Sequence, residues 1–408
     1  MRILVIGINY APERTSVGPF TTGLCEHLAA EGHKVTVITA FPYYPEWKVW
    51  DEFRGSLYRR EMVNNVDVRR VIHYVPAKPS HFLQRMAYDL SFTITGFLAA
   101  LRTGPCDLIY CSCPPPTVAL AAWVLGKMKR APYVIKVTDL ASDAALATGI
   151  MQDGVALRVA RRLEAFLYRN ALAVVCLCQG FVDRLSQLGI APEKLHLIPD
   201  WADTERIRPM VRDNSFCKEY QIAPEKFIVL HTGNMGKKQR LTNVIEAAEL
   251  SREMSSLMWV LVGQGEDRAA LEREIELRHL SNIRVVPLQP ANSLPQVYAS
   301  ADALLLNQVA TMEDAVIPSK LLTYMAAGRP IVAAVNERSE VARQIERAGC
   351  GVVVPAENPQ ALVDAIGKLR YDSSLCRSFG ENGRKYAEMH FTKSRVLGEY
   401  DQFIDRIV

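Results

Sequence analysis

The amino-acid sequence predicts an α/β protein built from two doubly wound, parallel-sheet domains. The chain has 408 residues and 49% hydrophobic composition, which is more than one ordinary hydrophobic core accommodates. Short β-branched runs alternate with amphipathic helical stretches along almost the whole chain, as in parallel βαβ units. This alternation occurs twice, on either side of an irregular connection at residues 201–224, without a close sequence repeat.

In the first half, the apolar runs predict strands that are buried on both faces. A helix with Phe20, Leu24 and Leu28 at a spacing of four follows the first run and ends at Gly32. The aromatic and proline-rich tract at 41–50 is more typical of a substrate-side loop than of a core element. The strands are expected at 3–8, 35–39, 66–71, 108–113, 133–137, 173–178 and 195–198.

The second half repeats the pattern and ends in helical segments after Asn358. We therefore expect two Rossmann-like domains, at 1–205 and 206–385, and a C-terminal helix at 386–408 that crosses back to the first domain. The strands of the second half are expected at 227–232, 258–262, 283–286, 303–306, 331–334 and 352–354.

Composition and charge exclude several classes of protein. Charged residues make up 23% and the net charge is +4, which indicates neither disorder nor a surface that coats nucleic acid. The nine cysteines include two Cys-x-Cys pairs in apolar runs, Cys111 with Cys113 and Cys176 with Cys178, which we interpret as buried small side chains and not as a zinc site. An odd number of cysteines, with no secretory leader, predicts a cytoplasmic protein.

A glycine- and lysine-rich turn follows the first strand of the second half. Ligands of open α/β sheets bind beyond the carboxyl ends of the strands, where helix N-termini attract phosphate. Glycines permit close approach of the backbone, and cations neutralise an anionic leaving group. A solvated helix start is the alternative. The turn predicts phosphate contacts at Gly233, Asn234, Lys237 and Lys238.

Two other strand ends carry glycines. Gly18 lies where the first helix begins and would let the backbone approach a diphosphate; a glycine required by the loop itself is the alternative. Gly263 and Gly265 form a Gly-x-Gly without the third glycine of a dinucleotide fingerprint, so hydride transfer from NAD has little support.

A later helix is opened by Pro318 and closed by Gly328, which places Ser319 and Lys320 at its positive end.

Asp139 follows the strand at 133–137 and is the best first-domain carboxylate to face an acceptor, with a helix-capping role as the alternative. Asp-x-Asp does not occur in the chain, so no metal site is expected.

Taken together, these motifs resemble glycosyltransferase family four, from the first strand to about Tyr386. Stretches 9–13 and 40–45 resemble most closely the colanic acid and related exopolysaccharide transferases. The motifs that carry the resemblance are the loop ending at Gly18, Gly32-His33-Lys34-Val35-Thr36-Val37, Ile198-Pro199-Asp200-Trp201, the turns at 233–238 and 262–265, Pro318-Ser319-Lys320, and Tyr324-Met325-Ala326-Ala327-Gly328-Arg329-Pro330.

The resemblance implies the GT-B fold, with the two domains facing across a cleft, and a retaining, metal-independent transfer from a GDP- or UDP-linked sugar, with no other cofactor. It implies that Gly18, Lys238 and Lys320 contact the donor diphosphate. We interpret Lys238, Lys320 and Asp139, the last chosen from its place after a strand, as the catalytic set. The turn after Val286, including Leu288, would receive the nucleobase. The transferred sugar would be a hexose or a deoxyhexose such as fucose, and the acceptor a polyprenyl-pyrophosphate-linked glycan.

The sequence departs from the family at two places. Many members have two glutamates eight residues apart, at positions matching Ala315 and Thr323, and neither is acidic here. Glu313 or Asp314 would replace the first of them in binding sugar hydroxyls, while Thr323 remains a donor-site position. Where many members have His-Asp, this chain has Thr138-Asp139, so no catalytic histidine is carried over.

A helix at 82–102 lies inside a basic stretch, 69–130, that carries eight Lys or Arg against two acids. Packing of this helix on the first sheet is the plain explanation of its apolar residues, Leu83, Met86, Leu90, Ile94, Phe97 and Leu101. Peripheral docking on the anionic inner face of the plasma membrane is the alternative.

Two other functions remain open at this stage. A nucleotide-sugar epimerase shares the two-domain fold and needs no acceptor. A non-catalytic protein that binds sugar nucleotides would fit the missing glutamate pair.

Overall fold

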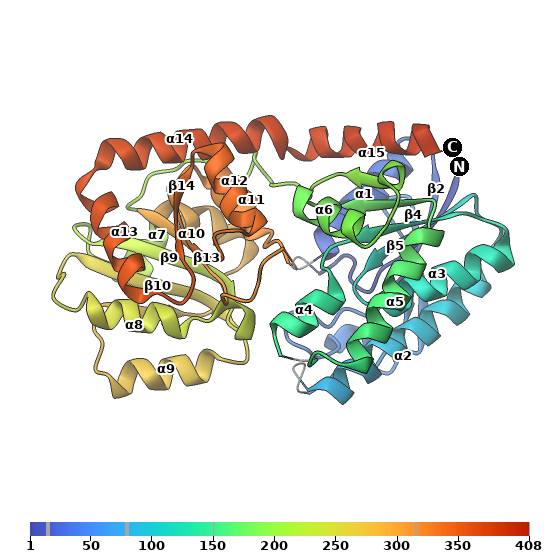
Figure 1. Ribbon diagram of the computed structural model, residues 1–408, viewed down its shortest axis with the longest axis horizontal. Helices are drawn as coiled ribbons and strands as arrows, with labels where there is room; N and C mark the ends of the chain where they lie inside the picture. The colour runs from blue at the N-terminus through green and yellow to red at the C-terminus, as the bar shows by residue number, and fades with distance from the viewer. Residues whose placement is uncertain (14–16, 78–80, 150, 315, 408) are drawn as a thin grey trace. The chain divides into compact units, whose positions relative to one another are not determined.

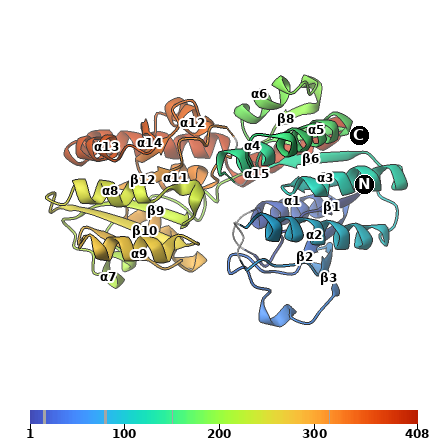
Figure 2. The same ribbon diagram turned by 60° about the horizontal axis from the view of Figure 1, so that its bottom comes forward.

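The computed structural model describes residues 1–407 except 14–16, 78–80, 150 and 315. The chain forms two compact units, Met1–Pro199 with Leu397–Val408, and Asp200–Val396. Each unit contains one sheet, and both sheets have the doubly wound order expected from the alternating pattern (Figures 1 and 2). The prediction of two Rossmann-like α/β domains is therefore confirmed.

In the first unit, the described strands form a sheet in the order β3-β4-β2-β1-β5-β6-β7-β8. All pairs are parallel except β3 with β4, an edge hairpin that the sequence analysis missed because β3 is mostly exposed and charged. The strands are β1 (Arg2–Ile6), β2 (Lys34–Ala40), β3 (Tyr58–Val63), β4 (Val66–Val71), β5 (Leu108–Cys113), β6 (Tyr133–Val137), β7 (Ala173–Cys176) and β8 (Leu195–Leu197).

Helices cover both faces of this sheet. On one face, α2 packs against α3, and α3 packs against α5 (Figure 1). On the other, α15 returns to the first unit, where Asp401 accepts a hydrogen bond from His27 of α1 at 2.8 Å. The helices are α1 (Gly18–Ala30), α2 (Phe82–Leu101), α3 (Pro116–Lys129), α4 (Ala141–Ala147), α5 (Val155–Asn170), α6 (Gln179–Gln187) and α15 (Lys393–Ile407).

The second unit has an all-parallel sheet in the order β11-β10-β9-β12-β13-β14. The strands begin and end within two residues of the predicted bounds, because each is built around a mainly apolar run. They are β9 (Phe227–Asn234), β10 (Leu257–Gln264), β11 (Ile283–Val286), β12 (Ala303–Asn307), β13 (Ile331–Val335) and β14 (Gly351–Pro355).

Two hydrophobic clusters fill the two faces of the second sheet. One lies under α8, α9 and α13, with Trp259 and Ile366 fully buried, and the other lies under α10, α11, α12 and α14, with Tyr324 and Met325 fully buried. The helices are α7 (Ser215–Glu219), α8 (Thr242–Leu250), α9 (Arg268–Leu277), α10 (Leu294–Ser300), α11 (Lys320–Ala327), α12 (Glu340–Ala348), α13 (Pro359–Tyr371) and α14 (Ser373–His390).

The packing of α2 differs from the plain explanation of its apolar residues. The helix faces the sheet with Tyr88, Phe92, Gly96 and Ala99. Four of the six residues that were expected to pack on the sheet are instead turned outward, whereas Phe97 and Leu101 are half-buried. Leu83, Met86, Leu90 and Ile94 are 42–65% exposed. In the described part of the chain, no helix has the length and apolarity needed to span a membrane.

The aromatic tract after β2 is a loop, as predicted, but part of it belongs to the core. Phe41 and Tyr43 are each 2% exposed, whereas Trp47 and Trp50 remain half-buried.

The four thiols of the two Cys-x-Cys pairs are buried, as predicted.

Candidate donor-binding site

The candidate site of the second unit lies at the carboxyl end of β9. Here the apolar strand ends in Thr232, Gly233 and Asn234, and α11 begins with Lys320 beside it. Tyr324, one turn into α11, is fully buried, and its hydroxyl accepts a hydrogen bond from the backbone N–H of Thr232 at 2.9 Å. This contact fixes the start of α11 against the end of β9.

The end of the Lys320 side chain lies next to the backbone of Gly233. A Cβ atom at Gly233, whose φ is +116°, would lie 3.3 Å from the Lys320 Nζ atom. The Nζ atom also lies 3.4 Å from Nε2 of His231, two residues earlier on β9. Because burial disfavours the charged form, the pKa of Lys320 is lowered to about 7. The structure therefore brings Gly233 and Lys320 together, two residues that the sequence analysis selected independently.

The turn that carries Lys237 and Lys238 is held in place from β12. It forms a short 3-10 turn, η3 (Lys237–Gln239). The buried Asn307 donates from Nδ2 to the carbonyl oxygens of Gln239 at 2.7 Å and Arg240 at 3.0 Å. Its Oδ1 atom accepts from Asn243 Nδ2 at 2.8 Å. Asn307 thus fixes the lysine turn to the strand beside it.

Replacement of Asn307 by alanine is expected to destabilise the protein by about 3 kcal/mol, since it leaves the buried Asn243 amide and two partly buried carbonyls without their partner. Urea denaturation of the full chain measures the change. The matched control is Asn382→Ala, which removes one hydrogen bond from an exposed asparagine to the Gly349 carbonyl and should cost less than about 1 kcal/mol. Equal losses in the two variants would contradict the role of Asn307.

Gly263 and Gly265 allow neighbouring backbone segments to approach closely at this end of the sheet. The pairing of β10 with β9 continues to Gly263 opposite Gly233. A Cβ atom on Gly263 would lie 1.8 Å from the Gly233 carbonyl oxygen, and one on Gly265 would lie 2.2 Å from the Met235 carbonyl oxygen. These two glycines therefore shape the loop that carries the candidate site.

The remaining predicted donor-site residues lie in or next to α11 and β11. Ser319 is the N-cap residue of α11, and Gly328 ends this helix with φ +67°. Thr323 is half-buried in α11. Val286 is 1% exposed and belongs to the core, whereas Leu288 is 37% exposed just beyond β11.

The two acidic candidates differ in their surroundings. The Asp314 carboxylate accepts hydrogen bonds from the backbone N–H of Glu340 at 2.7 Å and from Arg343 at 2.8 Å. The Glu313 side chain is exposed. Asp314 thus ties its loop to α12, and position 315, which matches a family glutamate, lies outside the described residues.

In the first unit, Gly18 begins α1, as predicted, and is buried. A Cβ atom at Gly18 would lie 3.2 Å from the Glu13 carbonyl oxygen, so the close packing of the 9–13 loop supports the alternative that this loop requires a glycine. Asp139 is half-buried after β6, and the following helix, α4, has no side-chain cap hydrogen bond.

Glu13 is a supporting residue of the first unit that was not predicted from the sequence. This side chain is 3% exposed, and its Oε1 atom accepts from the backbone N–H groups of Tyr43 and Tyr44, each at 2.8 Å. Its Oε2 atom accepts from Asn9 Nδ2 at 2.8 Å. Glu13 thereby joins the loops that follow β1 and β2. An acidic residue in the loop that follows the first buried strand was the available signal.

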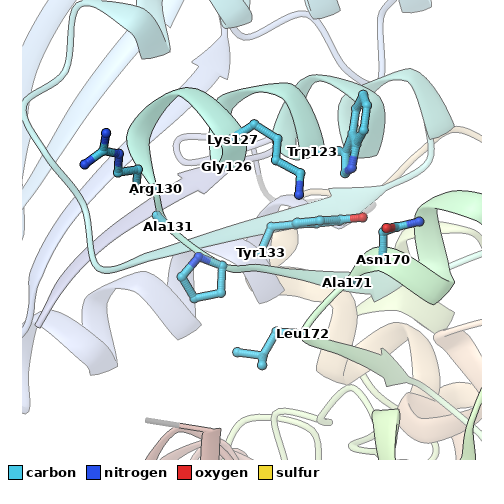
Figure 3. Close-up of a pocket in the computed structure, with 10 residues that line it drawn as sticks. Trp123, Gly126, Lys127, Arg130, Ala131, Tyr133, Asn170, Ala171 and Leu172 are labelled. Carbon is cyan, nitrogen blue, oxygen red and sulfur yellow. The ribbon is translucent and has the colours of Figure 1, made fainter.

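A surface pocket of about 480 Å³ lies elsewhere in the first unit (Figure 3). Trp123, Lys127, Tyr133 and Asn170 line it, from α3, the start of β6 and the end of α5. It opens at the amino end of β6, opposite to the end that carries Asp139. Because ligands of open α/β sheets bind at the carboxyl ends, we do not assign it to the donor or the acceptor.

Comparison with known proteins agrees with this architecture. Residues 15–201 match a glycosyl transferase 4-like domain, and residues 213–386 match the glycosyl transferases group 1 domain. The chain is 34% identical over 408 residues, 98% of each chain, to WcaI of Escherichia coli strain K12, whose name describes a colanic acid biosynthesis glycosyl transferase.

Solved structures share the fold at low identity. Sucrose-phosphate synthase from Thermosynechococcus elongatus superimposes with a TM-score of 0.78 at 16% identity, over 100% of this chain and 98% of that one. HepE from Anabaena, in complex with UDP-glucose, gives 0.74 at 16% identity over all of both chains. Fold and comparisons together define a glycosyltransferase of the GT-B type. Within that class, the chain belongs to glycosyltransferase family four.

Proposed function

We propose that this glycosyltransferase transfers a hexose or a fucose-like deoxyhexose, with retention, from a GDP- or UDP-linked donor to a polyprenyl-pyrophosphate-linked glycan. The product would serve exopolysaccharide assembly of the colanic acid or O-antigen kind. The position of Lys320 against Gly233, at the carboxyl end of β9, is the observation that carries this proposal. The names of WcaI and of the UDP-glucose complex of HepE support its polysaccharide and nucleotide-sugar parts.

The proposed reaction is a front-face displacement that needs no metal ion. As the bond from the sugar's anomeric carbon to the phosphate oxygen breaks, the acceptor hydroxyl attacks from the same face and gives its proton to that oxygen. Lys320 and Lys238 stabilise the negative charge that develops on the departing diphosphate. Glu313, rather than the anchored Asp314, would bind sugar hydroxyls, and Asp139 would face the acceptor.

A donor screen tests this function directly. Purified full-length protein is incubated with GDP-, UDP- and dTDP-sugars and a lipid-pyrophosphate glycan, and the products are analysed by mass spectrometry. We expect a glycan one sugar longer with a GDP- or UDP-sugar. An epimerised sugar nucleotide formed without acceptor would favour the epimerase. Binding without transfer or hydrolysis would contradict the proposed reaction.

We also propose that the first unit contacts an anionic membrane surface through α2. Leu83, Met86, Leu90, Ile94 and Leu98 form the α2 apolar face, and each is 42–65% exposed. Thr95 of α2 donates a hydrogen bond to the Ile72 carbonyl and the N–H of Ile72 donates to the Leu57 carbonyl, so the residues that flank the β3–β4 hairpin lie beside α2. Both Ile72 and Leu57 are exposed. Apolar side chains inside a basic stretch suit an anionic bilayer surface.

The protein is expected to sediment with phosphatidylglycerol vesicles and to be released as salt rises, since salt screens the attraction of the basic residues. The double variant Leu83→Gln/Ile94→Gln should bind at least about tenfold more weakly because it removes two large apolar side chains from the contact. Leu277→Gln, which changes a still more exposed leucine of the second unit, is the control. Indifference of the wild-type protein to these vesicles would contradict the membrane contact.

A further inference from the structure

His231 is an unusual residue for its position. It lies in the middle of an apolar central strand, β9, and is fully buried. A buried imidazole is costly unless its ring nitrogens find partners. Both nitrogens have partners here: Nδ1 lies 3.2 Å from the Leu305 carbonyl oxygen, and Nε2 lies 3.4 Å from Lys320 Nζ.

The contact with Leu305 indicates which ring nitrogen carries the proton. A carbonyl oxygen only accepts, so Nδ1 carries the proton and donates a hydrogen bond to the Leu305 carbonyl oxygen. Burial and the neighbouring Lys320 ammonium lower the pKa of His231 well below its ordinary value, and they outweigh the carbonyls of Leu305 and Asn234, which favour the charged ring. The ring is therefore neutral, and Nε2 offers a lone pair to Lys320.

We propose that His231 is a positioning residue that accepts a hydrogen bond from the Lys320 ammonium and holds Nζ against Gly233. This inference rests on the proposed function, since Lys320 there binds the donor diphosphate. Without an acceptor at this point, the lysine side chain would be free to leave Gly233, and its charged form would lose a partner. His231 thus sets both the position and the charge of the cation through Lys320, without touching the donor.

Other titratable groups lie on α11 and on the elements that adjoin it. Tyr324, on the same helix, is bonded to Thr232, and Asp314 is bonded to Arg343. Further ones include Glu313 in the loop before α11, Tyr298 on α10, Lys237 and Lys238 on η3, and Arg384 of α14, which donates to the Ala326 carbonyl at the far end of α11.

The decisive experiment measures the titration of the Lys320 amine itself, in the full-length protein without substrate. The protein is labelled briefly with acetic anhydride across a pH series, and the modification of Lys320 is quantified by mass spectrometry. We expect the wild-type amine to titrate near pH 7. His231→Phe keeps an aromatic ring but removes the acceptor, so the midpoint should fall by about one pH unit. In His231→Gln, whose Oε1 atom can accept from Lys320, the midpoint should return toward the wild-type value.

Kinetics then connect the contact to the reaction. The wild-type kcat/KM for the donor should fall as pH rises through the Lys320 midpoint, because the amine loses its positive charge. His231→Phe should lower kcat/KM about tenfold at pH 7 and move this limb to lower pH, whereas adding His231→Phe to Lys320→Ala should cause no further loss. The Lys320→Ala variant alone tests the proposed function, so the two ideas can fail separately.

An unchanged Lys320 midpoint in a folded His231→Phe protein would overturn the inference, whatever the activity. Equal losses in the Phe and Gln variants with the wild-type midpoint would also overturn it, since they would indicate a purely structural role for the ring.

Discussion

Replacement of Lys320 by alanine is expected to lower the turnover of sugar transfer roughly a hundredfold, equivalent to about 3 kcal/mol. The ammonium lies against the glycine where a phosphate can approach the backbone, and its contribution grows as negative charge develops on the leaving group. Steady-state kinetics with saturating donor measure the effect. Because the charge matters most in the transition state, we expect kcat to fall more than KM rises.

The control for this experiment is Lys368→Ala, an exposed lysine in the last turn of α13. This variant removes the same charge from the same unit and should keep the wild-type kcat. Normal turnover of Lys320→Ala with the correct donor would remove Lys320 from the catalytic set and, with it, the main support for the proposed mechanism.

The Gly263→Ala substitution is expected to have the largest effect on stability. A methyl group at Gly263 would lie 1.8 Å from the Gly233 carbonyl oxygen and overlap it. The backbone angle φ is +156°, a value that residues other than glycine rarely adopt. The paired ends of β9 and β10 must separate to relieve the overlap. Backbone strain and overpacking together should cost about 3–5 kcal/mol. Differential scanning calorimetry should show the transition of the second unit lowered by roughly 10 °C.

Gly367→Ala provides the matched control within the second unit. Gly367 lies in α13, and a Cβ atom there would meet no other atom within 4 Å. Alanine is the better helix former by about 0.5–1 kcal/mol, so this variant should melt at the wild-type temperature or slightly above it. If Gly263→Ala and Gly367→Ala melt at the same temperature, the ends of β9 and β10 can separate at little cost in stability, and the prediction is wrong.

Much of the candidate site could be predicted because its signals are local. A glycine–lysine turn after an apolar strand, and a helix opened by Pro318 and closed by Gly328, are patterns of neighbouring residues. Each pattern follows from the backbone chemistry of strand ends and helix ends. Their meeting at Gly233 and Lys320, 87 positions apart in the sequence, could be expected only from the topology of a parallel sheet.

The supporting contacts could not be predicted in the same way. His231, Asn307 and Tyr324 each act through a partner far away in the sequence, and in the sequence they appear as polar residues within or beside apolar segments. Periodicity identifies such positions as buried but says nothing about the atom that a buried polar group faces. The helix α2 shows the same limit, since two opposite rows of its apolar residues could equally have faced the sheet.

By itself, the sequence determined that this protein has two parallel-sheet α/β domains, where most of the strands begin and end, and which turns are suited to phosphate. These properties depend on local periodicity and on the chemistry of glycine, proline and helix ends. Only the tertiary structure decided that Lys320 lies against Gly233 beside a buried imidazole, that Asp314 is held by Arg343, and that the α2 apolar face is turned outward. Such features depend on packing between distant segments, where shape and hydrogen-bond partners, rather than hydrophobicity alone, select the arrangement.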